Sequence, residues 1–365
     1  MKIAMIGSRG IPAKIGGVEK VVEDLSNQLV SRGHDVAVYS RDYYVKGNST
    51  ATEAQQIVTS GVAHKKLEAI TYSFSAVRDA ITRNDFDIIH IHSPGPAMWT
   101  KLAKKTNIPV VFTVHADDWN RKRWSFLARA ILKLGLKTGM KYADAVTAVS
   151  SELASNLSAD FYRDVLPISN MLSPITAPNT DEFIRDNNLT CGQYFLHVGR
   201  LVAEKRLDLL LQAWSEINPE MPLVVAGEFY EAQYRDYCKS LAPKNVKFLG
   251  PVFDRNLSQL YANSFAIAQP SNLEGASLVC LEAANFAKCI ICSDISANKI
   301  QLGENAIFFE RENLKSLCLA ITKILENKSL ADQIGKQCQS VVTEKYSPAQ
   351  ITDSYLKVYN NLLQK

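Results

Sequence analysis

The residues with the clearest chemical potential lie between 271 and 282, in the run Ser-Asn-Leu-Glu-Gly-Ala-Ser-Leu-Val-Cys-Leu-Glu. A strand-like apolar segment precedes the run, and a helix-like segment follows it to Phe286. Glu274 therefore lies in the turn before a helix and Glu282 inside the helix, roughly 10 Å apart at the helical rise per residue. The helix N-terminus between them, with free backbone N–H groups and a favourable dipole, suits a phosphate. One carboxylate could hold a sugar and the other a ribose, an arrangement typical of a nucleotide-sugar site.

A pair of cations follows another strand-like segment. Arg200 and Lys205 leave the carboxyl end of a buried run that ends in a glycine turn, and open α/β sheets bind ligands at such ends. Cleavage of a sugar–phosphate bond adds about one negative charge to the departing diphosphate, so fixed cations stabilise the transition state more than the ground state. The two side chains are therefore candidates for diphosphate binding.

Three histidines and two acids are further candidates. His90 and His92 would face the same side of a strand, but no nearby Cys or acid completes a metal site, and a position in a cleft at the strand end is favoured. His115 is either a functional residue or a buried histidine with hydrogen-bond partners. Asp117 and Asp118 are acceptor-side bases or solvated loop acids.

Length and composition indicate an ordinary globular protein. With 365 residues, 47% hydrophobic and 21% charged, the chain predicts two domains, and no run of eighteen apolar residues is present. The first residues predict a strand and not a signal peptide. The seven cysteines, all in the second half, favour reduced thiols and a cytoplasmic protein. Cys289 and Cys292 form a CxxC pair inside a strand-like run, where core packing is the better interpretation.

Basic residues are concentrated in one segment. The net charge is +4, and residues 120–142 hold seven basic residues and no acid. Four of them recur every four residues and would form a basic stripe on one helix: Arg129, Lys133, Lys137 and Lys141. Such a helix could lie on an anionic membrane, or it could be a solvated face that packs its apolar side on a core. Nucleic-acid binding is less favoured, because aromatic and basic residues do not interleave elsewhere.

Strand and helix patterns alternate through both halves of the chain, which predicts parallel sheets covered by helices on both faces. In the first half, strands are expected at 2–6, 35–40, 66–70, 88–91, 110–114 and 145–149, and helices at 18–32, 75–83, 97–105 and 124–142. In the second half, strands are expected at 194–198, 223–226, 246–249, 265–269, 289–292 and 306–308, and helices at 204–216, 231–241, 257–262, 276–286, 314–326, 330–344 and 348–363. Turn residues at 173–180 mark the linker.

These motifs, in this order, resemble those of the retaining nucleotide-sugar glycosyltransferases of family 4, which have the GT-B fold. The resemblance covers the whole chain and depends on Gly199-Arg200 with Glu204-Lys205, on residues 248–250, and on the acid pair Glu274 and Glu282. The opening segment 6–19 is similar to a bacterial subgroup that contains many rhamnosyltransferases of surface-polysaccharide assembly. By contrast, Gly7-Ser-Arg-Gly10 does not match the dinucleotide-binding pattern of dehydrogenases.

The resemblance implies a role for each candidate residue. Residues 1–176 would form the acceptor-binding Rossmann-like domain, with residues 347–365 packing back on it, and residues 190–345 would bind the donor. His115 would lie near the reacting carbon, Arg200 and Lys205 would neutralise the diphosphate, and Glu274 would bind sugar hydroxyls. Further donor contacts would come from the loop glycines, the base-binding segment 250–253, the backbone of the helix start and the ribose-binding acid, namely Gly16, Gly17, Val252, Gly275, Ala276, Ser277, Leu278 and Glu282.

The predicted function is transfer of a sugar from a nucleoside-diphosphate sugar to a polyprenyl-diphosphate-linked glycan in the biosynthesis of surface polysaccharide, O-antigen or capsule. The subgroup resemblance implies rhamnose as the sugar. The enzyme is expected to need no metal or other cofactor and to act in the cytoplasm, on the inner face of the plasma membrane. A nucleotide-sugar epimerase and a non-catalytic nucleotide-binding scaffold remain as alternatives.

Overall fold

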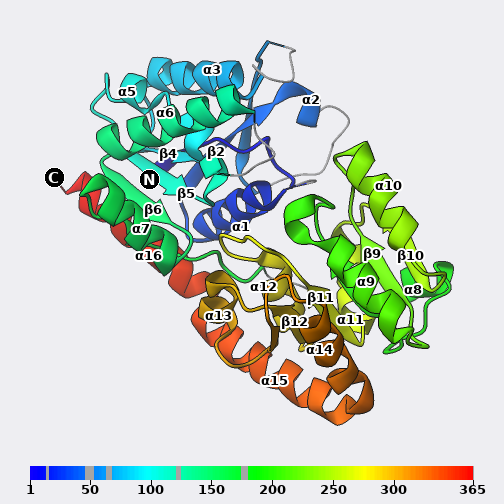
Figure 1. Cartoon of the computed structure of the whole chain (residues 1–365). Coiled ribbons are helices and arrows are strands. Elements are labelled where there is room, and N and C mark those ends of the chain that lie inside the picture. Colours follow the sequence, from blue (N-terminus) through cyan, green and yellow to red (C-terminus); the bar gives the residue numbers. More distant parts are fainter. Residues whose placement is uncertain (14–15, 46–52, 63–67, 121–124, 174–179, 365) are drawn as a thin grey trace. The chain divides into compact units, whose positions relative to one another are not determined.

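The computed structural model describes residues 1–13, 16–45, 53–62, 68–120, 125–173 and 180–364. The chain divides into two compact units, one formed by Met1–Met171 with Pro348–Lys365 and the other by Leu172–Ser347 (Figure 1). Each unit is a parallel sheet covered by helices, so the predicted α/β class with two doubly wound sheets is confirmed. The second unit includes helix α8 (Glu182–Asp186), which lies before the predicted start of the donor domain at residue 190.

The first sheet has seven strands in the order β3-β2-β1-β4-β5-β6-β7. The strands are β1 (Lys2–Ile6), β2 (Asp35–Arg41), β3 (Gln55–Thr59), β4 (Ile88–His92), β5 (Val110–Val114), β6 (Ala145–Ala148) and β7 (Leu166–Pro167). The pairing of β1 is parallel on both sides, with Ala4 opposite Ala37 and Ile89. Strands β4 and β5 are buried at every position, because helices cover both faces of the sheet.

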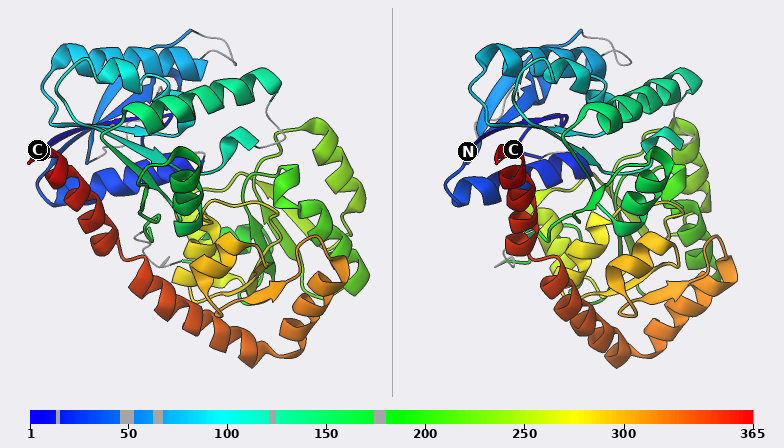
Figure 2. Two further views of the ribbon diagram at one scale, coloured as in Figure 1. Left: turned by 60° about the vertical axis from the view of Figure 1, so that its left-hand side comes forward. Right: turned by 90° about the vertical axis from the view of Figure 1, so that its left-hand side faces the viewer.

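Helices cover the two faces of this sheet in separate groups. The longer ones are α1 (Gly17–Ser31), α3 (Glu68–Arg83), α6 (Phe126–Tyr142), α7 (Ser151–Phe161) and α16 (Pro348–Leu363), and the short ones are α2 (Asp42–Val45), α4 (Pro94–Ala97), α5 (Thr100–Ala103) and the 3-10 turn η1 (Asp118–Asn120). Helices α1 and α16 share one apolar cluster with the sheet, and α3, α6 and α7 share the other. In both views of Figure 2, α16, coloured red, lies on the side of the sheet that α1 covers.

One predicted strand was wrong. Residues 68–70 of the expected strand at 66–70 form the first turn of α3, residues 66 and 67 lie outside the described residues, and the edge strand is β3 instead. The short alternation of polar and apolar residues there was misleading, because α3 buries Tyr72, Ala76 and Ala80 at helical spacing. Strand β3 has one buried residue, Ile57, and therefore carries almost no pattern.

The second sheet has six parallel strands in the order β10-β9-β8-β11-β12-β13. They are β8 (Phe195–Val198), β9 (Leu223–Ala226), β10 (Val246–Gly250), β11 (Ala266–Gln269), β12 (Cys289–Ser293) and β13 (Ile307–Phe309). The covering helices are α8 together with α9 (Leu207–Ile217), α10 (Ala232–Leu241), α11 (Asp254–Asn263), α12 (Leu278–Asn285), α13 (Ser296–Leu302), α14 (Leu314–Glu326) and α15 (Lys328–Lys345), and the 3-10 turn η2 (Ala203–Lys205) precedes α9.

In both sheets the strand order reverses once, between β1 and β4 in the first and between β8 and β11 in the second. Loops that leave neighbouring strands at such a point diverge to opposite faces and leave a crevice at the carboxyl edge, where open α/β sheets bind ligands. Arg200, Lys205 and Glu274 follow β8 and β11, so the topology of the second unit brings them to one crevice.

Candidate functional site

Lys205 and Glu274 form an ion pair at the reversal point of the second sheet. Lys205 ends η2, which follows β8, and Glu274 lies in the turn between β11 and α12. Their side chains are 13% and 8% exposed, so most of the pair is removed from water. The backbone supports this contact, since Asn272 N–H donates to the Glu204 carbonyl at 2.9 Å. The predicted proximity of the two elements is therefore present in the structure.

Arg200 lies beside this pair along the chain and is half-buried. Among the residues that the structure describes, no carboxylate forms an ion pair with its guanidinium. The preceding Gly199 has a φ of +142°, a conformation that side chains rarely adopt and that lets the chain turn sharply out of β8. Arg200 is thus a cation held near the crevice without a protein counter-ion in the described chain.

Glu282 is held by a buried tyrosine that sequence analysis missed. Tyr261 of α11 donates its hydroxyl proton to Glu282 Oε2 at 2.7 Å, and its ring stacks on Phe286 with centroids 5.9 Å apart. Burial raises the pKa of Tyr261 well above its usual value, so the hydroxyl stays a donor. The carboxylate is therefore fixed in one orientation, with one oxygen already engaged.

The start of α12 differs in one respect from the predicted phosphate cradle. The Ser277 side chain caps the helix by accepting from Cys280 N–H at 3.3 Å. Gln301 accepts from Ser277 N–H and donates to the Ser277 carbonyl, both at 2.9 Å. The Ser277 N–H is therefore already occupied, and the predicted phosphate-binding N–H groups that remain are those of Gly275, Ala276 and Leu278.

Two further groups lie at the carboxyl edge of this sheet. Val252 follows β10 and is half-buried against the apolar core, with the nearby Gly250 carbonyl accepting from Gly227 N–H at 2.8 Å. His197 of β8 donates from Nδ1 to the Ala268 carbonyl at 2.9 Å. Because a carbonyl only accepts, Nδ1 carries the proton. Burial lowers the pKa of His197 to about 4, so the ring beneath the Lys205–Glu274 pair is neutral.

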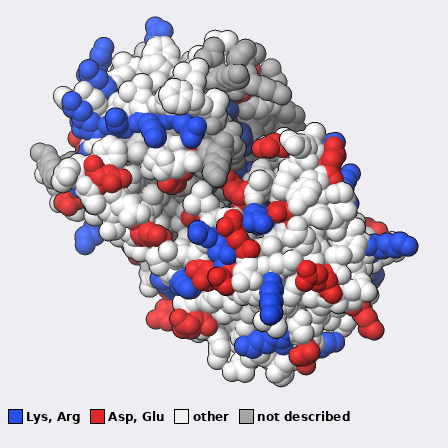
Figure 3. Space-filling view, viewed as in Figure 1, with Lys and Arg blue, Asp and Glu red and all other residues white. Residues whose placement is uncertain are grey.

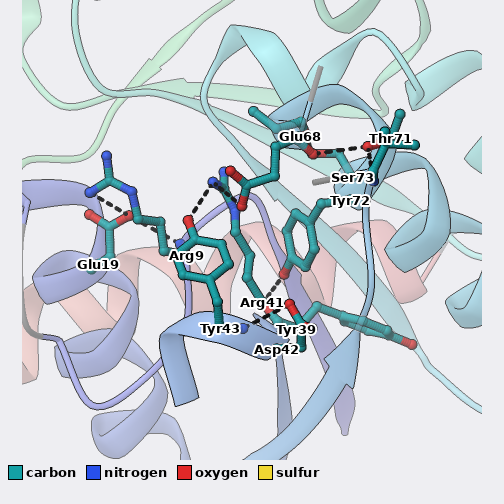
Figure 4. A network of polar contacts seen from close by, with 12 residues as sticks. Arg9, Glu19, Tyr39, Arg41, Asp42, Tyr43, Glu68, Thr71, Tyr72 and Ser73 are labelled. Carbon is teal, nitrogen blue, oxygen red and sulfur yellow. Dashed lines mark hydrogen bonds and ion pairs between the residues drawn. The ribbon is translucent and has the colours of Figure 1, made fainter. Parts of the chain in front are cut away.

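In the first unit, the glycine loop leads into α1. Gly16 has a φ of +105°, and a Cβ at this position would collide with the Glu19 carboxylate. Glu19, 6% exposed, accepts from Arg9 N–H at 3.0 Å and so ties the loop after β1 to the first turn of α1 (Figure 4). Gly17 is the first residue of that helix, and residues 14 and 15 lie outside the described residues.

A second polar network occupies the end of β2 (Figure 4). The Arg41 guanidinium lies 5.1 Å from the Tyr72 ring centroid and contacts Glu68 Oε1 at 3.5 Å and the Tyr43 hydroxyl at 3.1 Å. Tyr43 is 49% exposed. Arginine, carboxylate and an exposed aromatic ring together offer donors, acceptors and an apolar face at the carboxyl edge of the first sheet.

His90, His92 and His115 of the first unit form one buried cluster. The expectation that His90 and His92 lie in a cleft was wrong, because both are 0% exposed and their ring centroids are 4.0 Å apart. His90 bonds the Tyr359 hydroxyl at 2.8 Å and the Thr113 hydroxyl at 2.7 Å. His115 is 9% exposed, with Nε2 3.1 Å from His92 Nδ1. Strand alternation could show that the two rings share a side, but not that α16 covers that side.

The remaining candidates lie outside these clusters. Asp117 accepts from the Asn120 side chain at 2.8 Å, and Asp118 begins η1. Cys289 and Cys292 are buried strand residues whose thiol pKa values are raised by burial, as in a core. In the described ranges, no group of three or more His, Cys, Asp or Glu side chains could hold a metal ion.

The outward face of α6 combines basic and apolar side chains. Lys133, Lys137 and Lys141 are exposed, whereas Arg129 is half-buried, and residue 124 of the predicted helix lies outside the described residues. Three apolar side chains share this face, with exposures of 83%, 68% and 54%: Phe126, Leu127 and Leu134. Figure 3 shows the row of basic side chains over α6. Of the helices that the structure describes, none is both long and apolar enough to cross a membrane.

Two family models match successive parts of this chain. The family model described as Glycosyltransferase Family 4 matches residues 15–167, and that described as Glycosyl transferases group 1 matches residues 179–341. An uncharacterized glycosyltransferase of Methanocaldococcus jannaschii is 24% identical over 357 residues, covering 95% of both chains. The phosphatidyl-myo-inositol mannosyltransferase of Mycolicibacterium smegmatis is 24% identical over 95% of this chain and 90% of its own.

The fold is also shared with solved structures. The crystal structure of Anabaena HepE in complex with UDP-glucose superposes with a TM-score of 0.80 at 17% identity, covering 99% of this chain and 100% of that one. The two family models follow one another along the chain and together span most of its length. The chain therefore belongs to the family 4 glycosyltransferases, retaining enzymes of GT-B fold that use nucleotide-sugar donors.

Proposed function

We propose that the crevice at the β8/β11 reversal binds the donor diphosphate and sugar. The observation that carries this proposal is the Lys205–Glu274 ion pair, with Arg200 unpaired beside it among the described residues. Lys205 Nζ would contact the β-phosphate while Glu274, held by the same lysine, accepts from sugar hydroxyls. Glu282, oriented by Tyr261, would hold the ribose, and the backbone of residues 250–253 would contact the base.

Departure of the nucleoside diphosphate is the step that these residues would assist. As the bond between the anomeric carbon and phosphate oxygen breaks, negative charge grows on the diphosphate, and two fixed cations and the start of α12 stabilise it. The acceptor hydroxyl attacks from the same face and gives its proton to the departing phosphate, so the anomeric configuration is retained. This route requires no metal ion and no carboxylate nucleophile.

Substitution of the cations tests the proposal. Arg200→Ala and Lys205→Ala should each lower kcat by about 100-fold or more, because each removes transition-state charge stabilisation in a site partly shielded from water. Turnover of donor is measured with a panel of nucleotide sugars that includes UDP-glucose, GDP-mannose and dTDP-rhamnose. The matched control is Arg235→Ala, an exposed arginine of α10 that pairs with Asp236. Unchanged turnover in both cation variants would refute the diphosphate site.

The acceptor is proposed to be a lipid-linked glycan at an anionic membrane. Support comes from the exposed face of α6, where Phe126 and Leu127 can enter the interface and Lys133, Lys137 and Lys141 can meet anionic headgroups. The name of the M. smegmatis relative, phosphatidyl-myo-inositol mannosyltransferase, includes a phospholipid. We place the protein on the cytoplasmic side of the membrane, with a polyprenyl diphosphate as carrier and surface polysaccharide, O-antigen or capsule as product.

Two other activities are separable from this one. An epimerase would convert a nucleotide sugar to an isomer without acceptor, and a binding scaffold would tolerate Glu274→Ala without loss of phenotype. Rhamnose as the transferred sugar is proposed from the opening segment 6–19 alone. The donor panel ranks it directly against glucose and mannose.

A further inference from the structure

His92 is a buried side chain with two polar neighbours of different kinds. Its Nδ1 is 3.1 Å from His115 Nε2, and its Nε2 is 3.5 Å from Met5 Sδ. The ring is 0% exposed and packs on His90 at a centroid distance of 4.0 Å. Gly7 lies so close to the His92 backbone that a Cβ on residue 7 would collide with the His92 carbonyl. The ring and the backbone of His92 are therefore both held in place by the packing around them.

Both rings of the His92–His115 pair are neutral. Burial lowers the pKa of His115 to about 4 and that of His92 well below its usual value. A neutral imidazole carries one N–H and one lone pair, so the neighbours of each ring decide which nitrogen is protonated.

The methionine sulfur fixes the direction of the chain of hydrogen bonds. A thioether accepts but cannot donate, so His92 Nε2 carries the proton that points to Met5. His92 Nδ1 is then an acceptor, and His115 must donate to it through Nε2–H. The opposite arrangement would place the His92 Nε2 lone pair against the sulfur lone pairs and leave a buried acceptor unsatisfied.

We infer that His92 is a positioning residue, which holds His115 in its Nε2–H form so that His115 Nδ1 accepts a hydrogen bond from a substrate hydroxyl at the carboxyl edge of the first sheet, the edge at which open α/β sheets bind ligands. The inference rests on the proposed sugar transfer, which gives the protein hydroxyl-bearing substrates. His115 Nδ1 makes no hydrogen bond within the part of the chain that the structure describes, and the residue keeps 9% of its surface exposed. Selection between substrates would then include a hydroxyl that can donate at this point.

The tautomer is measured by nitrogen NMR of protein labelled with 15N-histidine, with the His115 signals assigned from His115→Gln. The expected pattern is Nε2–H for both His92 and His115 in the unsubstituted protein. His92→Phe keeps a ring but removes the acceptor, so His115 should become a mixture of the two forms. An Nδ1–H pattern for His115 in the unsubstituted protein overturns the inference.

Kinetics test the consequence. His92→Phe should lower kcat by about 10-fold, with a change of less than about twofold in donor KM, because orientation in the transition state is lost. His92→Asn should retain kcat within about threefold, since its amide oxygen can replace Nδ1 as the acceptor. The matched control is Tyr359→Phe, which removes a bond to the adjacent His90 and leaves the His92–His115 pair intact. Equal kcat values for His92→Phe and Tyr359→Phe overturn the inference.

His115→Ala separates this inference from the proposed site. Full activity in His115→Ala would remove His115 from the substrate site, whatever the NMR pattern shows. Loss of activity in His115→Ala together with unchanged activity and tautomer in His92→Phe would reject the role of His92 alone.

Discussion

Buried neutral histidines make the stability of this protein sensitive to acid. Burial lowers the pKa of His90 to about 3 and those of His115 and His197 to about 4, whereas an unfolded chain titrates near 6.5. Between these values the unfolded chain binds protons that the folded chain does not. The contribution of these histidines to the free energy of unfolding should therefore be fully present above pH 6.5. It should be lost as the pH drops toward 4, by at most about 1.4 kcal/mol per pH unit for each histidine.

Urea unfolding at pH 7, 6 and 5 measures this dependence. His90→Gln removes one titrating group and should flatten the slope, and His34→Gln, which alters a half-exposed histidine near the N-terminus, serves as the comparison. A midpoint that does not change between pH 7 and 5 contradicts the expectation.

At this residue scale, the strand-end positions of Arg200, Lys205 and Glu274 were predictable, because parallel strands bring their carboxyl ends to one edge. The contacts that orient the site were not. Tyr261 is 21 positions from Glu282, and Gln301 is 24 positions from Ser277. Such partners depend on how α11 and α13 pack beside α12, which no local pattern specifies.

At the scale of elements, the two faces of α6 differ in burial and in the side chains that they carry. Its inner face approaches α4 so closely that Gly135 leaves no room for a Cβ beside the Pro94 carbonyl. Its outer face carries the exposed lysines and apolar residues. Periodicity predicted this helix and its basic residues, but only the packing shows that Phe126 and Leu127 face outward while Arg129 is half-buried.

Liposome binding tests the outer face. Replacement of Lys133, Lys137 and Lys141 by Gln should lower the partition onto phosphatidylglycerol vesicles by about 100-fold, at about 1 kcal/mol for each lysine, with no effect on neutral phosphatidylcholine vesicles. The matched control replaces three exposed lysines of α14 and α15, namely Lys315, Lys323 and Lys328. Equal partition of the α6 variant and the control would rule out this membrane surface.

At the scale of the whole molecule, the last helix belongs to the first unit. Arg32, the residue after α1, forms an ion pair with Asp353 and donates to the Ala349 carbonyl at 2.9 Å. Tyr359, 0% exposed, fills the sheet face beside α1 and bonds His90. The fold class was predictable from alternation alone, and so was the extent of α16, because its apolar residues recur at helical spacing.

Removal of the Tyr359 ring tests this division. Tyr359→Ala should cost roughly 3–5 kcal/mol, as for other large-to-small core substitutions, and the loss should be confined to the first unit. Hydrogen exchange should show lost protection in β1, β4 and α1, with β8, β11 and β12 unchanged. The control, Asn360→Ala, alters an exposed neighbour on the same helix. Equal loss of protection in both sheets would contradict the assignment of α16.

The first unit is translated before the second unit, except for α16, which follows it in the chain. The first unit can therefore complete its fold only after the second unit has been translated. The nascent chain carries Ile3, Met5 and Val38 on a sheet face that lacks the cover of α16 and has only α1 while residues 172–347 are being translated. The second unit is one contiguous segment and can fold as soon as it leaves the ribosome. The first unit must wait until α16 has been translated. Chaperone demand during biosynthesis should therefore come from the amino-terminal half.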